Sequence, residues 1–222
     1  MFRDREDAAR RLAWRLKGRP FRDPLVLAIP HGGVVIGAVL ARELDADLDV
    51  VLARKIHAPG NPELAVGAVS EDGQVYLNAE AAPVLGLTEE YLVQERQHQI
   101  DEIARCRELF CGDRQAAPIT GRSVIVTDDG IATGSTMMAA LQAIKAQNPH
   151  EVIVAIPVAP EDSLEQIRRR CDKAVCVVTP RFFWSISNFY EDFPQVGDAE
   201  VVGLLRSFTP AEFVGASTQA VA

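Results

Sequence analysis

Residues 124–136, VIVTDDGIATGST, combine paired carboxylates with glycines and hydroxyl side chains in one short segment. An apolar run ends in Asp128 and Asp129, and the glycines that follow, Gly130 and Gly134, let the backbone approach a ligand closely. Free amide groups at a helix start, aided by the positive end of the helix dipole, bind phosphate. Carboxylates accept hydrogen bonds from sugar hydroxyl groups. The segment therefore predicts a site for a phosphorylated sugar, with additional hydroxyl donors at Thr133, Ser135 and Thr136.

Other motifs with similar ingredients do not fit the spacing. A nucleotide-binding P-loop needs Gly-x-x-x-x-Gly-Lys before Ser or Thr, and this segment contains no lysine. Phosphatases of the haloacid dehalogenase type need Asp-x-Asp, whereas Gly130 stands two positions after Asp128. A structural alternative makes Asp128 and Asp129 a helix-capping turn. Adjacent carboxylates repel each other and are costly to bury without partners, which favours the binding site.

The composition is that of a globular protein and disfavours two kinds of partner. The 222 residues carry a net charge of −8, which argues against sequence-independent binding to the phosphate backbone of nucleic acid. The charged start, MFRDREDAARRLAW, lacks the apolar run of a secretory signal, and Pro30 and two glycines interrupt the longest uncharged run, 24–41. The four cysteines have no metal-binding spacing and are expected to be free thiols. We therefore expect a cytoplasmic protein with neither a nucleic-acid partner nor a membrane span.

Apolar strands alternate with amphipathic helices along the chain, which predicts a parallel α/β sheet covered by helices. Residues 54–63, RKIHAPGNPE, have the composition of a loop, and the apolar stretches 64–69 and 74–77 indicate a small hairpin. Ligands of such sheets bind at the carboxyl ends of the strands. The expected strands are 25–29, 48–53, 123–127, 151–156 and 174–178, and the expected helices are 5–16, 34–44, 88–110, 134–146 and 161–170.

In this setting residues 124–136 resemble the signature of the type I phosphoribosyltransferases: a hydrophobic strand, two acidic residues and a Thr-Gly phosphate loop. The resemblance implies a Rossmann-like parallel sheet with a small hood, and phosphoribosyl pyrophosphate as the ligand. It implies that Asp128 and Asp129 hold the ribose hydroxyls. The 5′-phosphate would then bind in the loop formed by Gly130, Ile131, Ala132, Thr133, Gly134, Ser135 and Thr136.

Two other segments that follow strands match this family, and the resemblance extends over about residues 25–160. IPHGG, 29–33, resembles the pyrophosphate loop, which implies that His31, Gly32 and Gly33 bind pyrophosphate. ARK, 53–55, resembles the second basic site at the base of a mobile hood loop. Arg54 and Lys55 would then be catalytic groups that neutralise the leaving pyrophosphate.

The segments PHGGVVIGAVLA, RKIHAPGNPELAVGAVSEDG and DDGIATGST together resemble a bacterial branch of this family. The chain departs from that branch at His31, where an arginine is usual, so an imidazole replaces a fixed cation. Hypoxanthine-guanine enzymes have an acid before the Thr-Gly, and adenine enzymes have alanine there, as this chain has at Ala132. Purine salvage of the hypoxanthine type is therefore disfavoured.

The resemblance implies displacement of pyrophosphate from the anomeric carbon of ribose by a nitrogen nucleophile, with no covalent protein intermediate. Mg²⁺ prefers oxygen ligands, keeps several waters and bridges substrate phosphates to one or two carboxylates. An acidic protein that binds an anionic substrate needs such a metal. We expect Mg²⁺ at Asp128, Asp129 and Asp192, mostly through water or substrate.

The densest group of aromatic residues in the chain is at 181–193, RFFWSISNFYEDF, and it follows the last expected strand. The resemblance implies that Phe183 stacks on the acceptor and that Asp192 lies near the metal. A hydrophobic cluster that seals the sheet edge explains the same residues equally well. His57 is a second candidate for the acceptor pocket, since it stands in the expected hood and histidine titrates near neutrality.

We expect one phosphoribosyltransferase-like domain over residues 1–210, with a hood from about 54–115 and 181–210, and a flexible tail at 211–222. The predicted function is Mg-dependent transfer of the 5-phosphoribosyl group to a nitrogenous acceptor such as a nucleobase, by a homo-oligomer that we expect to be a dimer. Two alternatives stay open. One is a phosphoribosyl pyrophosphate sensor that has lost the chemistry, which fits His31 and Ala132. The other is a hydrolase of phosphorylated nucleosides, for which the sequence shows no positioned nucleophile or base.

Overall fold

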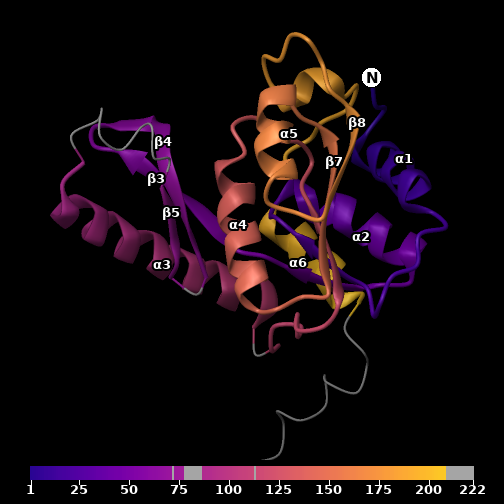
Figure 1. The fold of residues 1–222 in the computed structure, drawn as a ribbon, viewed down its shortest axis with the longest axis horizontal. Helices are drawn as coiled ribbons and strands as arrows, with labels where there is room; N and C mark the ends of the chain where they lie inside the picture. Colours follow the sequence, from indigo (N-terminus) through magenta and orange to yellow (C-terminus); the bar gives the residue numbers. More distant parts are fainter. Residues whose placement is uncertain (72, 78–86, 113, 209–222) are drawn as a thin grey trace, which may run out of the picture.

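The structure, a computed structural model, describes residues 1–71, 73–77, 87–112 and 114–208. A central sheet of five parallel strands has the order β2-β1-β6-β7-β8 (Figure 1). This arrangement confirms the predicted parallel sheet. The strands are β1 (Leu25–Ala28), β2 (Asp47–Val50), β6 (Ser123–Thr127), β7 (Glu151–Val158) and β8 (Lys173–Val178).

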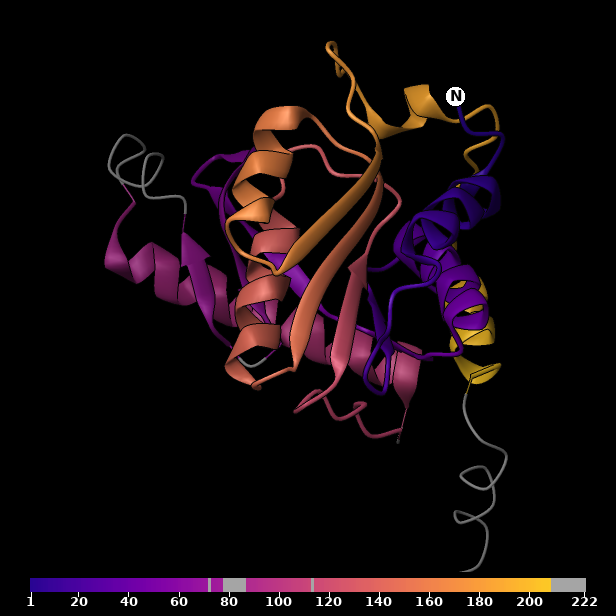
Figure 2. The same ribbon diagram turned by 45° about the vertical axis from the view of Figure 1, so that its right-hand side comes forward.

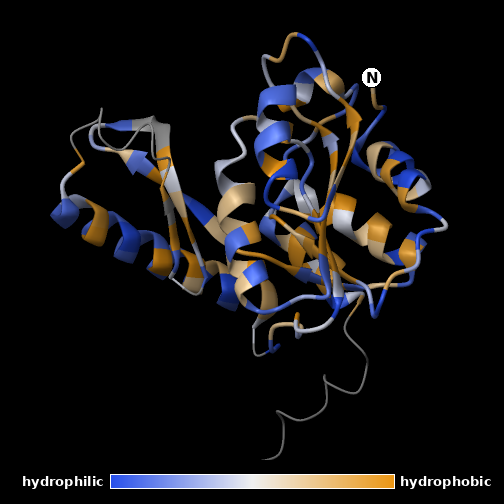
Figure 3. Cartoon of the chain, in the orientation of Figure 1, coloured by the Kyte–Doolittle hydropathy of each residue, from blue (hydrophilic) through white to orange (hydrophobic). Residues whose placement is uncertain are grey.

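Helices cover both faces of this sheet, as Figure 2 shows. Successive residues of β1 alternate between two cores: Leu27 packs on the side of α4, and Val26 and Ala28 pack on the side of α2. Because both faces are buried, the inner strands β1, β6 and β7 are largely apolar, and Figure 3 shows apolar residues in orange. One face carries α1 (Arg5–Leu16), α2 (Gly32–Leu44) and α6 (Asp198–Arg206), and the other carries α4 (Ser135–Ala146) and α5 (Glu161–Arg168).

The strand order reverses between β1 and β6, which are neighbours paired in register from Leu25 with Val124 to Ala28 with Thr127. The helix that follows β1 packs on one face of the sheet, and the helix that follows β6 packs on the other. A crevice opens at the carboxyl ends of two such strands, and this is where open α/β sheets bind their ligands. The segments 29–33 and 128–134 both begin at this crevice.

A second sheet, antiparallel and three-stranded, lies between α4 and the long helix α3 to one side of the central sheet (Figure 1). Antiparallel pairing of its last two strands confirms the predicted hairpin. The predicted loop at 54–63 is wrong, because strands fill most of it and Pro59 and Gly60 form only a tight turn, with φ of 69° at Gly60. The elements are β3 (Ala53–Ala58), β4 (Asn61–Ser70), β5 (Val75–Leu77) and α3 (Glu89–Cys111).

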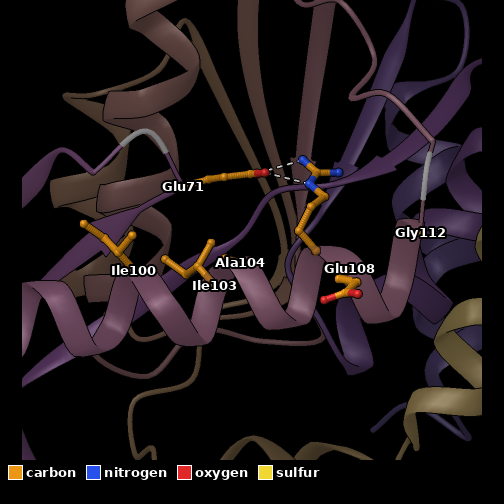
Figure 4. A pocket seen from close by; sticks show the side chains of 7 residues that line it. Glu71, Ile100, Ile103, Ala104, Glu108 and Gly112 are labelled. Atoms are coloured by element: carbon orange, nitrogen blue, oxygen red, sulfur yellow. Dashed lines mark hydrogen bonds and ion pairs between the residues drawn. The ribbon is translucent and has the colours of Figure 1, made fainter.

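Charged side chains join the second sheet to the central one. The Arg107 guanidinium of α3 donates to both carboxylate oxygens of Glu71, at 2.6 and 2.7 Å, directly after β4 (Figure 4). Its Nη1 also lies 3.5 Å from Oδ1 of Asp49 in β2, a carboxylate that pairs with Arg114 as well. Asp49 is fully buried, and a buried carboxylate needs such partners. This network therefore fixes the position of α3 against β2.

The segment after β8 continues with a 3₁₀ helix, η1 (Ile186–Phe189), and with α6, neither of which was predicted from the sequence. Asp198 and Glu200 in the first turn of α6 suit the helix dipole, and Val201 and Leu205 are its buried residues. Among the described residues, no helix has both the length and the apolar character needed to span a membrane. The expected tail, 211–222, lies outside the described residues.

Candidate active site

The loop between β6 and α4 lines a cavity of about 140 Å³ together with Lys55 of β3 and Ile186 of η1. Gly134 is the N-cap of α4, with φ of 79°, and no side chain caps this helix start. The first backbone N–H groups of a helix have no partner within the helix, so they are free to bind an anion here. The loop residues that line the cavity are Gly130, Ile131, Ala132, Thr133, Gly134, Ser135 and Thr136.

Ile186 closes one side of this cavity and explains why Gly130 follows the carboxylates. A Cβ atom at Gly130 would lie 2.7 Å from Cγ2 of Ile186, which is too close for any side chain without a rearrangement. Ile186 was not predicted as a site residue, because it lies among the aromatic side chains of 181–193 with no local signal for a phosphate loop.

The two carboxylates after β6 pack directly against the two glycines after β1. A Cβ atom at Gly32 would overlap the Asp129 carboxylate, since it would lie 2.6 Å from its Cγ. A Cβ atom at Gly33 would lie 2.9 Å from Cα of Asp128. Only glycine allows so close an approach. The structure therefore brings the predicted ribose-binding and pyrophosphate-binding segments together at the crevice.

Arg5 of α1 forms a buried ion pair with Asp129, with Nε and Nη2 both 2.9 Å from Oδ2. The same guanidinium donates from Nη1 to the Pro194 carbonyl at 2.7 Å and lies over the Phe193 ring, 3.7 Å from its centroid. The Tyr190 hydroxyl donates to the Asp129 carbonyl at 2.6 Å. Arg5 and Tyr190 were not predicted as site residues, since they lie 124 and 61 positions from Asp129 in the sequence.

Burial raises the pKa of both carboxyls. The pKa of Asp128 lies well above its ordinary value, first because of burial and then because of the neighbouring Asp129 charge. The Asp129 backbone N–H, which donates to Asp128 Oδ1 at 2.8 Å, offsets only part of this shift. Burial also raises the pKa of Asp129, and Arg5 opposes the rise. Carboxyls perturbed in this way at a crevice are typical of functional sites.

Arg54 and Lys55 lie on opposite faces of β3, because successive residues of a strand point to opposite sides. Lys55 lines the cavity of the phosphate loop. Arg54 donates to Oε1 of Gln99 in α3 at 2.9 Å, and lines a second pocket of about 660 Å³ between α3 and α6. The two predicted catalytic cations therefore line different pockets.

His31 ends the segment after β1 and directs its Nε2 toward Oδ1 of Asp198, the first residue of α6, at 2.9 Å. Its ring meets Phe110 edge-on, with centroids 5.6 Å apart. His31 thereby lines the same second pocket as Arg54. Asp198 was not predicted as a site residue, because α6 itself was not foreseen.

Three predicted residues lie apart from the phosphate cavity. Nδ1 of His57 faces α3 and lies 3.7 Å from Oε1 of Glu95. Phe183 stacks on Phe189, with ring centroids 5.6 Å apart. Asp192 is exposed in the segment after η1. None of these predicted residues is among the described residues that line the phosphate cavity.

The donor groups at the crevice fit a metal that arrives with its substrate. Within the described part of the chain, no cluster of three His, Cys, Asp or Glu side chains could hold a metal ion. Asp128 lines the cavity at the helix start of α4, and the Asp129 carboxylate lies against Gly32 at the start of α2. Mg²⁺ commonly takes one or two protein carboxylates and completes its shell with water and substrate phosphates. These residues therefore fit Mg²⁺ held between substrate and carboxylates.

The crevice lies where the strand order reverses, and it combines paired carboxylates with a glycine-containing phosphate loop. These features define the class of fold that the sequence indicated. Comparisons with known proteins agree. The family model described as the phosphoribosyl transferase domain matches residues 2–194. The chain therefore belongs to the phosphoribosyl transferase domain family, which confirms the resemblance found in residues 124–136.

The similar proteins include relatives from Mycobacterium tuberculosis and from Thermus thermophilus. MT0597 and Rv0571c of Mycobacterium tuberculosis, whose curated names contain the words phosphoribosyl transferase, are both 37% identical over 221 residues. The match covers 98% of this chain and 50% of theirs, so the chain spans about half the length of these relatives. The crystal structure of TT1426 from Thermus thermophilus is 38% identical with a TM-score of 0.82, and the match covers 94% of this chain and 99% of that one.

Proposed function

We propose that this protein transfers the 5-phosphoribosyl group from phosphoribosyl pyrophosphate to a nitrogenous acceptor such as a nucleobase, with release of pyrophosphate. The observation that carries the proposal is the meeting of two helix starts at one crevice. Gly32 begins α2 and Ser135 begins α4, neither helix has a side-chain cap, and Asp128 and Asp129 lie between them. Two anion-binding helix starts that flank carboxylates suit a sugar with phosphates at both ends and hydroxyls in the middle.

The roles of the residues follow from this placement. The 5′-phosphate binds the amides of the loop 130–136, with Lys55 on the same side. The ribose hydroxyls donate to Asp128 and Asp129. The pyrophosphate binds the backbone amides of Gly32 and Gly33, on the side that Arg54 and His31 share.

The chemistry needs charge stabilisation at two places. As the bond from C1′ to the pyrophosphate oxygen breaks, negative charge grows on the leaving group and positive charge grows on the ribose. The start of α2 stabilises the first, and the carboxylates of Asp128 and Asp129 lie near the second. Mg²⁺, when bound with the substrate, neutralises part of the pyrophosphate charge.

Calorimetry with phosphoribosyl pyrophosphate, followed by pyrophosphate release with a panel of nucleobases and small amines, tests the proposal. We expect binding that Mg²⁺ strengthens, and release with at least one acceptor. Binding without release from any acceptor would indicate the sensor. Absence of binding, with cleavage of a phosphorylated nucleoside instead, would indicate the hydrolase.

The substitution Gly134→Val is expected to weaken binding of ribose 5-phosphate at least tenfold. Gly134 has φ of 79°, a backbone conformation that costs an ordinary residue about 1–2 kcal/mol, and its side chain would stand where the phosphate approaches the amides. Calorimetry with ribose 5-phosphate measures the loss.

Gly121→Val is the matched control, because Gly121 has φ of 74° and lies before the amino end of β6, where a Cβ atom would meet no neighbouring atom within 4 Å. Both variants should lose similar stability, but only Gly134→Val should lose the phosphate. Equal affinity of the two variants for ribose 5-phosphate would mean that the anion binds elsewhere.

A further inference from the structure

We propose that Arg5 is a positioning residue of the ribose site: it holds one oxygen of the Asp129 carboxylate so that the other oxygen receives a ring hydroxyl of the sugar. This inference rests on the proposed phosphoribosyl transfer, in which Asp128 and Asp129 bind the ribose. It adds a residue of the first helix, 124 positions from Asp129, that sets the preference of the site for a hydroxylated sugar.

The contact between Arg5 and Asp129 leaves one carboxylate oxygen for a ligand. Nε and Nη2 of Arg5 both lie 2.9 Å from Oδ2 of Asp129. Both contacts use the same oxygen, which leaves Oδ1 to the ribose. Two hydrogen bonds from one rigid, planar group fix the direction of the carboxylate as well as its position. The two side chains are only 8% and 13% exposed, so solvent screens this contact weakly.

Arg5 is itself held by the segment that follows η1. Its Nη1 donates to the Pro194 carbonyl at 2.7 Å, and its guanidinium carbon lies 3.7 Å from the centroid of the Phe193 ring. All three guanidinium nitrogens are therefore engaged, and an aromatic ring covers one face of the group. An arginine anchored in this way serves as a fixed support for the carboxylate.

Backbone hydrogen bonds join the N-terminal segment to the segment that follows η1. The Phe2 N–H donates to the Phe189 carbonyl at 2.8 Å, and the Glu191 N–H donates to the Phe2 carbonyl at 2.9 Å. Between these two bonds, Tyr190 forms a parallel bridge with Phe2 and donates from its hydroxyl to the Asp129 carbonyl. The peptide and the carboxylate of Asp129 are thus held by two segments that are also tied to each other.

Arg5 acts through Asp129 rather than on the substrate itself. It is not among the described residues that line the phosphate cavity or the pocket shared by His31 and Arg54. The Asp129 carboxylate, in contrast, lies against both Arg5 and the backbone of Gly32, where a Cβ atom would overlap it. This packing confines the carboxylate to one orientation, which is how a preorganised binding site lowers the cost of holding its ligand.

The fixed orientation makes the site selective for hydroxyl groups. A ring hydroxyl donates to Oδ1 of Asp129, whereas a ring without hydroxyls would leave a largely buried carboxylate against an apolar surface with no partner. A site built to bind a hydroxyl rejects ligands that lack it far more strongly than an apolar pocket does. A carboxylate that Arg5 did not hold could turn toward water and avoid much of this penalty, so the selectivity depends on Arg5.

Calorimetry without added metal, so that no Mg²⁺ bridges ligand and carboxylate, tests this role with two phosphates. Ribose 5-phosphate carries the ring hydroxyls, and tetrahydrofurfuryl phosphate has the same ring and phosphate without them. We expect wild type to prefer ribose 5-phosphate. Arg5→Lys keeps the charge but loses the planar pair of donors. It should bind ribose 5-phosphate about tenfold more weakly, which is the loss of about one charge-assisted hydrogen bond, and tetrahydrofurfuryl phosphate as wild type does.

Arg122→Lys is the matched control, because Arg122 is as buried as Arg5 and also pairs with carboxylates. Its side chain is 7% exposed, and it binds Asp23 and Asp47 just before the amino end of β6, whereas Asp129 follows the carboxyl end. Thermal unfolding checks that both lysine variants fold. Only Arg5→Lys should lose the preference for ribose 5-phosphate, since loss of packing alone would weaken both ligands equally.

A second variant loosens Arg5 without changing any charge. Phe193→Leu removes the aromatic ring that covers the guanidinium. We expect about a twofold to fivefold loss of affinity for ribose 5-phosphate, with no loss for tetrahydrofurfuryl phosphate. If Arg5→Lys does not fold, the same comparison in Phe193→Leu carries the test.

A double-mutant cycle separates the contact with Asp129 from other effects of Arg5. Asp129→Asn removes the charge that Arg5 holds, so the addition of Arg5→Lys to this variant should cost no further affinity for ribose 5-phosphate. In the wild-type background the same substitution should cost the full tenfold given above.

Two kinds of failure are distinguishable. If Arg5→Lys and Phe193→Leu both keep the wild-type preference, or if Arg5→Lys costs as much in Asp129→Asn as in wild type, this inference is wrong. The proposed function then stands as long as wild type binds phosphoribosyl pyrophosphate and releases pyrophosphate. If wild type itself binds the two phosphates equally, the ribose site of the proposed function is wrong, and this inference fails with it.

Discussion

A protein that carries Gly32→Ala is expected to bind phosphoribosyl pyrophosphate at least a hundredfold more weakly while keeping its fold. The new Cβ atom would lie 2.6 Å from Cγ of Asp129 and 2.8 Å from Nε of Arg5. These two side chains form a buried ion pair, so neither can move alone, and the added methyl group must displace the carboxylate that we assign to the ribose. Overpacking of this kind also costs about 1–3 kcal/mol of unfolding free energy. Calorimetry and thermal unfolding measure the two effects.

The control for this substitution is Gly203→Ala. Gly203 lies in α6, where a Cβ atom would meet no neighbouring atom within 4 Å, so alanine there is expected to leave binding unchanged and to stabilise the helix by up to about 1 kcal/mol. A Gly32→Ala protein with the affinity of wild type would show that the Asp129 carboxylate does not hold the ligand.

The central fold could be predicted because its signals are local. Residues 25–28 and 124–126 are uninterrupted apolar runs, as expected of strands buried on both faces, and the turn residues that follow mark their ends. The segment 54–63 was assigned wrongly because Pro59 and Gly60 mark one tight turn rather than a loop, and Pro62 lies within β4. The pairing that makes β3 a strand comes from β4, and its packing comes from α3 and α4.

The site could be predicted only where its functional residues lie close together in the sequence. The carboxylates, the glycines and the hydroxyl groups of 128–136 lie in one run, and their resemblance to a known family located the crevice. The partners of that run come from distant segments: Arg5 from the first helix, and Tyr190 from after the last strand of the central sheet. A single arginine in a charged segment or one tyrosine among aromatic residues carries no local sign of its partner. Their roles depend on tertiary packing.

The two carboxylates of the crevice are expected to respond oppositely to removal of their charge. In Asp128→Asn we expect a higher free energy of unfolding at pH 7, because the raised pKa of Asp128 means that its ionised form is less favourable in the folded protein than in the unfolded chain. The asparagine oxygen can still accept the Asp129 backbone hydrogen. Asp129→Asn should instead destabilise the protein by about 3 kcal/mol, because the Arg5 guanidinium would stay buried without its counter-charge, and this loss outweighs the relief of the burial that raises the pKa of Asp129.

The pH dependence of stability directly tests the predicted direction of the Asp128→Asn effect. A carboxyl whose pKa is raised by folding lowers stability as the pH rises above its ordinary value near 3.8, and it carries no such penalty once protonated. The advantage of Asp128→Asn over wild type should therefore be greatest at pH 7 to 8 and should vanish toward pH 4. Urea unfolding of both proteins over this range measures the difference. A variant less stable than wild type at pH 7 would contradict the assignment of the penalty to Asp128.

Both substitutions should nevertheless weaken binding of phosphoribosyl pyrophosphate. Each loses a charge-assisted hydrogen bond to a ribose hydroxyl, worth about 1.5–3 kcal/mol, which corresponds to roughly a 10- to 150-fold loss of affinity. The double variant is expected to lose about 10²- to 10⁴-fold by calorimetry. A capping turn with no ligand would show the stability changes without the binding loss, so the two readouts together separate a structural turn from a ribose site. A charged Asp128 lowers the stability of the free protein at neutral pH. Such a cost is typical of a functional site, where a ligand uses the charge.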